Sequence, residues 1–187
     1  MTARPAATAP ARPAVKLLDI LQGKWLGHPL HPAVVHVPLA LWIVAAVCDV
    51  LIYRDIAVSV LTRLSLYCVA GGLLGALVAV PTGIAEWVPI KKEKPAWKLA
   101  LYHMLLNVAA VALFVVNFVW RLRELEVGDG ISKAVLVTSV VGAVVLVASG
   151  YIGSLMAYDH GVSVARLSKK KWRAVAARAG SRLPEEK

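Results

Sequence analysis

The sequence has few charged residues and very little cysteine. Charged residues make up 17% of the 187 residues, only 11 are acidic, and the two cysteines are Cys48 and Cys68. Both cysteines lie inside apolar stretches, which argues against a disulfide scaffold and predicts small packing roles for them. The chain also lacks a Cys/His cluster of the kind that holds an iron–sulfur centre.

Motifs of the common enzyme classes are absent as well. The sequence contains no P-loop, Rossmann fingerprint, nucleophile elbow or catalytic triad pattern. It has no Cys-x-x-Cys-His, which excludes a covalently attached c-type haem. The net charge of +10 does not predict nucleic-acid binding, because the basic residues flank apolar segments and no soluble fold carries a groove. These absences favour a role other than enzyme.

Long apolar runs dominate the chain. Hydrophobic residues make up 59% of the sequence, and the mean hydropathy is +0.69. A helical crossing of the bilayer needs roughly 20 apolar residues, and four stretches meet that length. They are Ala33 to Tyr53, Leu64 to Val80, Leu99 to Trp120, and Ala134 to Ile152. The sequence therefore predicts an all-α integral membrane protein, a four-helix bundle with short links.

The chain divides into three parts. Residues 1–26 form an Ala/Pro-rich leader that should be disordered, with an interfacial helix expected from Leu17 to Trp25. Residues 27–164 form the transmembrane domain, and residues 165–187 a basic tail. Small residues at four-residue spacing, such as Gly71, Gly75 and Ala79, predict close helix packing. No internal repeat is evident between the two helical hairpins.

Basic residues are distributed unevenly between the two sides of the membrane. The leader, the link at residues 91–98 and the tail together hold 16 of the 21 Lys and Arg residues, and all three lie on one side. The positive-inside rule places that side in the cytoplasm, so we expect both termini there. Anionic lipid headgroups are the expected partner of the basic tail, centred on residues 169–173.

All five histidines fall at the predicted cytoplasmic end of the bundle. His28 and His31 precede the first helix in a His-Pro-x-His-Pro segment, and each proline biases the preceding histidine away from α conformation. His36 and His103 lie about one turn inside the first and third helices, and His160 follows the fourth. We expect Pro38 to kink the first helix near His36.

Three hypotheses account for these histidines. In the first they are structural, capping helix ends beside Trp25, Trp87 and Trp97. In the second, His36 and His103 are the axial ligands of a b-type haem. In the third, a single transition metal ion, Zn, Cu or Fe, is held by a subset of the metal-ligating residues at this end. That set is His28, His31, His36, His103, His160 and Glu86.

Polar residues are also expected at the opposite end of the bundle. Asp49 lies near the far end of the first helix, where it is expected to pair with Arg54 or Arg63. A proton-relay role is the alternative, but the sequence offers no chain of partners across the span. Asn117 and Ser139 are expected to form hydrogen bonds between helices.

The segment Gly27 to Pro38 resembles the opening motif of a bacterial membrane family, domain of unknown function 2231. Thr82 to Trp87 is similar to that family's Thr-Gly-x-x-Asp-Trp segment, with Glu86 in place of the Asp. His103 to Asn107 and Gly153 to Val164 resemble its third-helix and closing motifs. The resemblance implies a four-helix protein of the bacterial inner membrane. Some relatives are joined to Rieske iron–sulfur domains, which implies a redox protein as partner.

These observations lead to two functional hypotheses. The first is a haem- or metal-binding redox accessory module that uses the histidines. The second is a membrane scaffold, without catalytic activity, whose histidines are structural. A transporter ranks third, since no inverted repeat or discontinuous helix indicates one. The sequence does not determine the oligomeric state.

Overall fold

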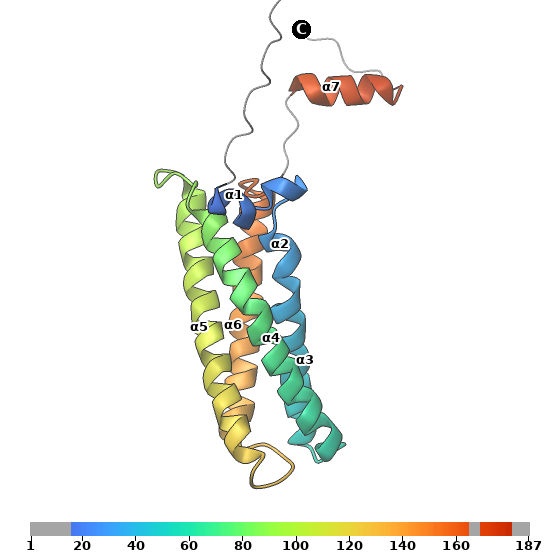
Figure 1. The fold of residues 1–187 in the computed structure, drawn as a ribbon, viewed down its shortest axis with the longest axis vertical. Helices are drawn as coiled ribbons and strands as arrows, with labels where there is room; N and C mark the ends of the chain where they lie inside the picture. The colour runs from blue at the N-terminus through green and yellow to red at the C-terminus, as the bar shows by residue number, and fades with distance from the viewer. Residues whose placement is uncertain (1–15, 165–168, 181–187) are drawn as a thin grey trace, which may run out of the picture.

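The computed structural model describes residues 16–164 and 169–180, and this part of the chain contains helices and no strand. In chain order the helices are α1 (Leu17–Leu21), the 3-10 turn η1 (Lys24–Leu26), α2 (His31–Val34), α3 (His36–Ile52), α4 (Val58–Trp87), α5 (Pro95–Glu124), α6 (Lys133–Tyr158) and α7 (Lys169–Arg178). The predicted all-α class is confirmed (Figure 1).

Four helical segments are long and apolar enough to cross a membrane. They are His31–Ile52, Val58–Trp87, Pro95–Glu124 and Lys133–Tyr158, of 22, 30, 30 and 26 residues. Three of them include a whole apolar stretch expected from the sequence and extend beyond it at both ends, whereas the first begins two residues before Ala33 and ends one residue before Tyr53. The additional turns contain polar residues at the helix ends. A prediction based on hydropathy alone leaves such residues out of a span.

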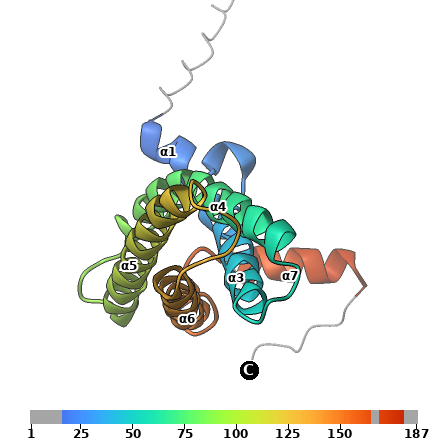
Figure 2. The same ribbon diagram turned by 90° about the horizontal axis from the view of Figure 1, so that it is seen from below.

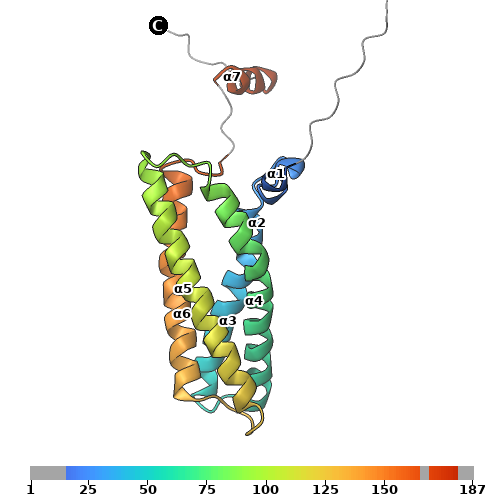
Figure 3. The same cartoon turned by 60° about the vertical axis from the view of Figure 1, so that its left-hand side comes forward.

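The spans form two antiparallel hairpins, α3 with α4 and α5 with α6. Viewed along the bundle, the four helices form a ring in which α4 contacts α3 and α5, and α6 contacts α3 and α5 (Figure 2). The side view shows α1, α2, the end of α4 and the start of α5 at the same end of the bundle (Figure 3). In this ring, α3 lies diagonally opposite α5, and α4 lies diagonally opposite α6 (Figure 2).

The first span is broken near its start. α2 ends at Val34 and α3 begins at His36, with Val35 between them. Pro38 explains the break, because it has no N–H to donate to Val34 and its ring crowds that carbonyl. The interruption lies next to His36, where Pro38 was expected from the sequence to disturb the helix.

The segment before the first span is shorter and more bent than expected. The interfacial helix predicted from Leu17 to Trp25 is divided into α1 and η1 by a turn at Gly23, whose φ is +68°. A Cβ at Gly23 would lie 2.2 Å from the His28 carbonyl oxygen, so only glycine fits. Lys24 donates to Asp19 on the exposed surface, and this hydrogen bond lowers the pKa of the Asp19 carboxyl.

The core is organised in three layers, each centred on a pair of side chains, one from α2 or α3 and the other from α5, that meet across the bundle. The rings of His31 and His103 meet near one end, Trp42 stacks on Phe114 in the middle, and Asp49 pairs with Arg121 near the other end. We call these the histidine, aromatic and arginine layers. The aromatic layer is dry: Trp42 is 1% exposed and Phe114 is fully buried.

Small residues on α4 and α6 make room for these pairs. A Cβ at Gly72 would lie 2.2 Å from the Trp42 ring, and one at Gly142 would lie 2.7 Å from the Phe114 ring. In lipid, such small residues allow helices to pack closely where no hydrophobic force drives them together. The predicted close packing is confirmed at two of the α4 positions named from the sequence: a Cβ at Gly71 would lie 3.1 Å from Leu41, and one at Gly75 would lie 3.0 Å from Pro38.

The same intervals recur in both hairpins. His31, Trp42 and Asp49 are separated by eleven and then seven residues, and the same intervals separate His103, Phe114 and Arg121. Intervals of seven and eleven return a helical position to nearly the same face. The paired residues of the aromatic and arginine layers are unlike, so the matching intervals place the members of each pair at the same level of the bundle without making the two hairpins a sequence repeat.

Two predicted segments lie largely outside the described residues. The expected disorder of the leader concerns residues before Lys16, and the beginning and end of the basic tail are likewise not described. Within the tail, the structure describes the helix α7, which contains the three consecutive lysines Lys169 to Lys171.

Candidate functional site

The candidate site is the histidine layer, defined by His31, His103, Asn107 and Ser149. The rings of His31, from α2, and His103, from α5, have centroids 6.3 Å apart and planes at 89°. Each histidine belongs to a different hairpin. The site therefore joins the two halves of the bundle at this end.

Both rings are held in the same way. Nδ1 of His31 lies 2.9 Å from the carbonyl oxygen of Ala79, and Nδ1 of His103 lies 2.8 Å from that of Ser149. A carbonyl only accepts, so in each ring Nδ1 is the nitrogen that carries the proton. In the neutral ring, Nε2 then keeps its lone pair. Neither Nε2 has a hydrogen-bond partner among the residues that the structure describes.

A glycine also packs against each ring, one turn beyond the residue whose carbonyl accepts from that ring. A Cβ at Gly83 would lie 2.9 Å from Cε1 of His31, and one at Gly153 would lie 3.2 Å from Cε1 of His103. Gly83 follows Ala79, whose carbonyl accepts from His31, by four residues, and Gly153 follows Ser149 by the same interval. The two histidines therefore occupy equivalent niches on α4 and α6.

Asn107 reinforces the position of His103. Its amide donates to the His103 carbonyl oxygen at 2.8 Å and to the Ser149 hydroxyl at 2.7 Å. The Ser149 hydroxyl in turn lies 3.0 Å from Nδ1 of His103. Thr82 has a similar place beside His31, with its hydroxyl 3.4 Å from that Nδ1. Partners of this kind fix the orientation of a ligating imidazole.

Glu86 connects the site to the chain that follows α6. One carboxylate oxygen accepts from the backbone N–H of His31 at 3.2 Å, and the other accepts from the hydroxyl of Ser163. Ser163 has a φ of +57°, which is uncommon for a residue with a side chain. Glu86 thus holds the start of α2 and the closing loop together.

The other predicted ligands are placed less centrally. His36 begins α3 and is exposed, and His28 and His160 are also exposed. The ring that meets His103 is that of His31, because residues five apart in a helix face different sides and His36 points away. All five histidines lie at the same end of the bundle, as the sequence predicted, since α2 and α5 begin there and α6 ends there.

The predicted six-residue metal set does not form one cluster in this structure. Across residues 16–164 and 169–180, no three His, Cys, Asp or Glu side chains lie close enough together to hold a metal ion. The donor set at the histidine layer is therefore two imidazoles. Whether any of these residues binds a ligand stays a prediction.

Tryptophans border the site. Trp87, at the end of α4, lies against Trp97 of α5 with ring centroids 5.6 Å apart. The indole N–H of Trp87 is buried and has no acceptor among the described residues. Buried donors are nearly always paired, so this end of the bundle contains a polar group that a ligand or ordered water would satisfy.

Sequence reasoning missed several residues of the site. Ser149, Gly83 and Thr82 were not assigned to it, and His31 was ranked behind His36 as a haem ligand. One signal was available: Gly83 and Gly153 stand at matching positions in the second and fourth helices. The backbone carbonyls of Ala79 and Ser149 leave no signal in a sequence.

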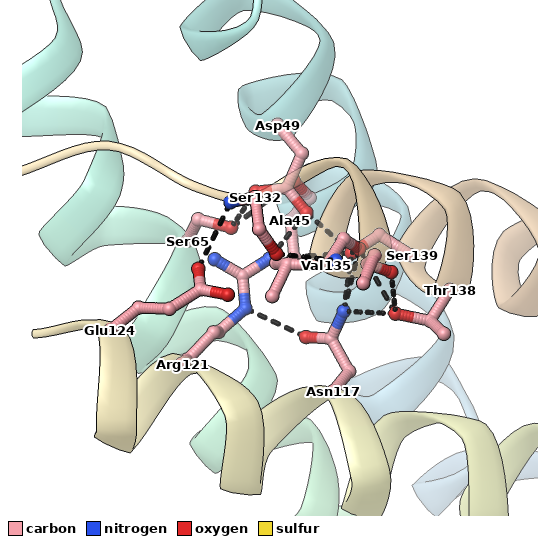
Figure 4. A network of polar contacts seen from close by, with 11 residues as sticks. Ala45, Asp49, Ser65, Asn117, Arg121, Glu124, Ser132, Val135, Thr138 and Ser139 are labelled. Carbon is pink, nitrogen blue, oxygen red and sulfur yellow. Dashed lines mark hydrogen bonds and ion pairs between the residues drawn. The ribbon is translucent and has the colours of Figure 1, made fainter.

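The arginine layer at the opposite end is a denser network (Figure 4). It comprises Asp49, Ser65, Asn117, Arg121 and Ser139, all fully or almost fully buried. Asp49 accepts from Ser65 at 2.6 Å and from Arg121 and Ser139. Arg121 also donates through Nε to Asn117 at 2.7 Å. All four spanning helices are thus tied together at one level.

This network corrects one expectation from the sequence. Asp49 does form a buried ion pair, but its partner is Arg121 and not Arg54 or Arg63. Arg54 and Arg63 are close to Asp49 in the chain, yet both are exposed. Arg121 reaches Asp49 across the α3–α5 diagonal, which sequence proximity does not reveal. The expected hydrogen bonds of Asn117 and Ser139 between helices are confirmed.

The comparisons with known proteins agree with the resemblance seen in the motifs. No curated protein and no solved structure matches the chain. The family model described as "Predicted membrane protein (DUF2231)" matches residues 27–166, from the first histidine motif to just beyond α6. This match covers well over half of the sequence and both polar layers, so the chain belongs to the family of predicted membrane proteins known as domain of unknown function 2231.

Proposed function

We propose that the chain is a membrane redox accessory module that binds one b-type haem between His31 and His103. The observation that carries the proposal is the matched pair of imidazoles. Each comes from a different hairpin, and each has Nδ1 tied to a carbonyl of the neighbouring helix. In the part of the chain that the structure describes, each also has an Nε2 without a hydrogen-bond partner. Tying Nδ1 in this way is how proteins prepare Nε2 for an iron or other metal.

The number of ligands favours haem over a mononuclear metal. A zinc or non-haem iron site needs at least three protein ligands, and the described residues bring no such group together. Haem iron needs only two axial ligands, because the porphyrin supplies the other four. Two imidazoles from facing helices of a four-helix bundle are a familiar set.

The distance between the centres of the two imidazole rings also supports haem ligation by this pair. With metal–nitrogen bonds of about 2 Å, and about 1 Å more from nitrogen to ring centre, two imidazoles on opposite sides of one ion have centres roughly 6 Å apart. The His31 and His103 centroids are 6.3 Å apart. The haem pair inferred from the sequence, His36 and His103, is therefore replaced in this proposal by His31 and His103.

A bound haem would supply one-electron chemistry at this end of the bundle. The residues of the chain would set its properties. His31 and His103 would ligate, Ser149 and Asn107 would keep the His103 ring oriented, and Glu86 would hold His31 in place through its backbone N–H. The indole N–H of Trp87, which has no acceptor within the described residues, is a donor at the same end.

The orientation and partners belong to the same proposal. The excess of Lys and Arg on the histidine side supports placing that side, with both termini, in the cytoplasm of a bacterial inner membrane. The lysines of α7 would then meet anionic lipid headgroups, and an electron-transfer protein would approach the histidine end from the cytoplasm. Reporter fusions at the two termini and at the 125–132 link test this orientation: activity of a cytoplasmic reporter at the link would contradict it.

Optical spectroscopy with elemental analysis tests the site. The detergent-purified full chain is examined oxidised and reduced, and iron, copper and zinc are measured. We expect a Soret band that shifts on reduction, with one iron per chain. His31→Ala and His103→Ala should abolish it, whereas His36→Ala and His28→Ala, the matched controls, should retain it.

Three other outcomes would contradict the proposal in distinct ways. Loss of the band in His36→Ala and not in His31→Ala would restore the ligand pair first inferred from the sequence. Stoichiometric copper or zinc without a Soret band would indicate a metal site. A folded protein without colour or metal, even after expression with added haem, would favour a scaffold whose histidines are structural.

A further inference from the structure

The strongest observation outside the histidine layer is an unsatisfied donor in the arginine layer. Arg121 is 3% exposed and uses Nε and one terminal nitrogen for hydrogen bonds. Its other terminal nitrogen, Nη1, is buried and has no hydrogen-bond partner among the described residues. In a membrane span an unsatisfied N–H of a charged group is strongly destabilising, because lipid offers no acceptor.

Arg121 also lines a small cavity of about 10 Å³. The cavity lies where the end of α5 meets the start of α4 and the link that leads to α6. Its polar lining comes from Thr62, Arg121 and Glu124, and the remaining lining residues are Leu66, Leu125, Gly130 and Ile131. A cavity that holds one water needs roughly 10–15 Å³ and two to four polar partners.

The acceptors around this cavity have capacity left. One oxygen of the half-buried Glu124 carboxylate accepts from the backbone N–H of Ser132 at 3.0 Å, and no hydrogen bond occupies the other among the described residues. The Thr62 hydroxyl donates to the Val58 carbonyl oxygen and accepts from the Gly130 N–H, which leaves one lone pair. Glu124 forms no direct ion pair with Arg121 within 4.0 Å in this part of the chain. Both nevertheless face the same small space (Figure 4).

We infer that this cavity is a binding site for a single water molecule that bridges Arg121 Nη1 to the carboxylate of Glu124. The water accepts from Nη1 and donates to Glu124 and to Thr62, so three partners hold it. A polar gap too wide for a direct hydrogen bond and one molecule across is the geometry that ordered water fills. A halide is disfavoured, because the volume is small and Glu124 is negatively charged.

The water changes the character of the network. Without it, the Asp49–Arg121 pair ends in a buried donor. With it, hydrogen bonds run without interruption from Ser65 and Asp49 through Arg121 to Glu124 at the end of α5. The buried ion pair is then connected to the aqueous phase on its own side of the bundle, while the aromatic layer separates it from the histidine layer.

The test is a structure of the full chain in lipid, by crystallography or electron microscopy, at a resolution that shows single waters. We expect one density peak within hydrogen-bond distance of both Nη1 and Glu124. An ordered cavity without density, or a direct Arg121–Glu124 ion pair, would overturn the inference. Crystals grown in bromide complete this arm, because an anomalous peak in the cavity would assign it to an anion.

Radiolytic hydroxyl labelling gives a second test in solution, since a bound water generates the radical beside the side chains that contact it. We expect Leu66 to be labelled strongly and Phe114, in the dry aromatic layer, to be unlabelled. Glu124→Leu should reduce the labelling of Leu66, and the matched control Glu126→Leu, at an exposed position, should not. Equal labelling of Leu66 in both variants, or none in the wild type, would count against the water.

Discussion

The two polar layers of the bundle are built from similar parts and satisfied to different degrees. In the arginine layer, Asp49 accepts three side-chain hydrogen bonds and every spanning helix contributes. In the histidine layer, the hydrogen bonds of each ring run through Nδ1, and within residues 16–164 and 169–180 neither Nε2 has a partner. The first arrangement holds helices together, whereas the second leaves ligating atoms available. The difference is the basis for assigning stability to the arginine layer and the proposed haem site to the histidine layer.

The largest effect should come from breaking the ion pair. Arg121→Met leaves the fully buried carboxylate of Asp49 without its cation, which should cost about 3–5 kcal/mol of unfolding free energy. Thermal unfolding in detergent measures this loss. Adding Asp49→Leu should recover most of it, because two apolar side chains replace the pair. A single variant as stable as the wild type would show that the arginine layer does not hold the bundle together.

A smaller loss of unfolding free energy is expected from a change in the aromatic layer, which lies between the histidine and arginine layers. Gly72→Ala would place a Cβ 2.2 Å from the Trp42 ring, so the ring or α4 must shift, at a cost of about 1–3 kcal/mol. Gly150→Ala is the matched control on a helix, since nothing lies within 4 Å of a Cβ there. Equal melting temperatures of the two variants would mean that α3 and α4 are not packed as described.

The two asparagines of α5 allow a direct comparison of the layers. Asn107→Leu removes the support of His103, so it should weaken haem binding by about tenfold and lower stability by only about 1 kcal/mol. Asn117→Leu, in the arginine layer, should lower stability more and leave haem binding unchanged. Haem titration and thermal unfolding of both variants measure these effects. The reverse pattern would exchange the roles of the layers.

The smallest effect is expected on the surface. The hydrogen bond from Lys24 lowers the pKa of Asp19 from its ordinary value of 3.8. A lowered pKa stabilises the fold above that value and the stabilisation is lost as the pH falls through the lowered pKa. Since the pair is exposed, Asp19→Asn should leave the melting temperature unchanged at neutral pH and at pH 3. A measurable loss at neutral pH alone would show that α1 contributes to stability.

Much of the fold could be predicted from the sequence, because bilayer thickness converts hydropathy directly into helices. Local chemistry predicts the four spans, the interruption of the first span near Pro38, and the close packing at Gly71 and Gly75. The partner of Asp49 could not be predicted, because it lies 72 residues away and across the bundle. Sequence neighbours such as Arg54 are attractive partners only until the diagonal is known.

The candidate site was predicted in part. The end of the bundle and His103 follow from the motifs and the topology. The choice between His31 and His36 depends on where the helix breaks and which way each ring turns. The orientation of the His31 ring is set by the backbone carbonyl of Ala79. Every residue has a backbone carbonyl, so the sequence does not show which one binds the ring.

The Asp49–Arg121 pair bears on how the protein is made. Its two members lie 72 residues apart and belong to different hairpins. At roughly 5–20 residues per second, the ribosome adds Arg121 roughly 4–14 s after Asp49. During that interval the first hairpin carries an acidic residue whose cation does not yet exist. The insertion of α3 therefore depends on its apolar residues, and Asp49 is without its cation until the second hairpin arrives and completes the pair.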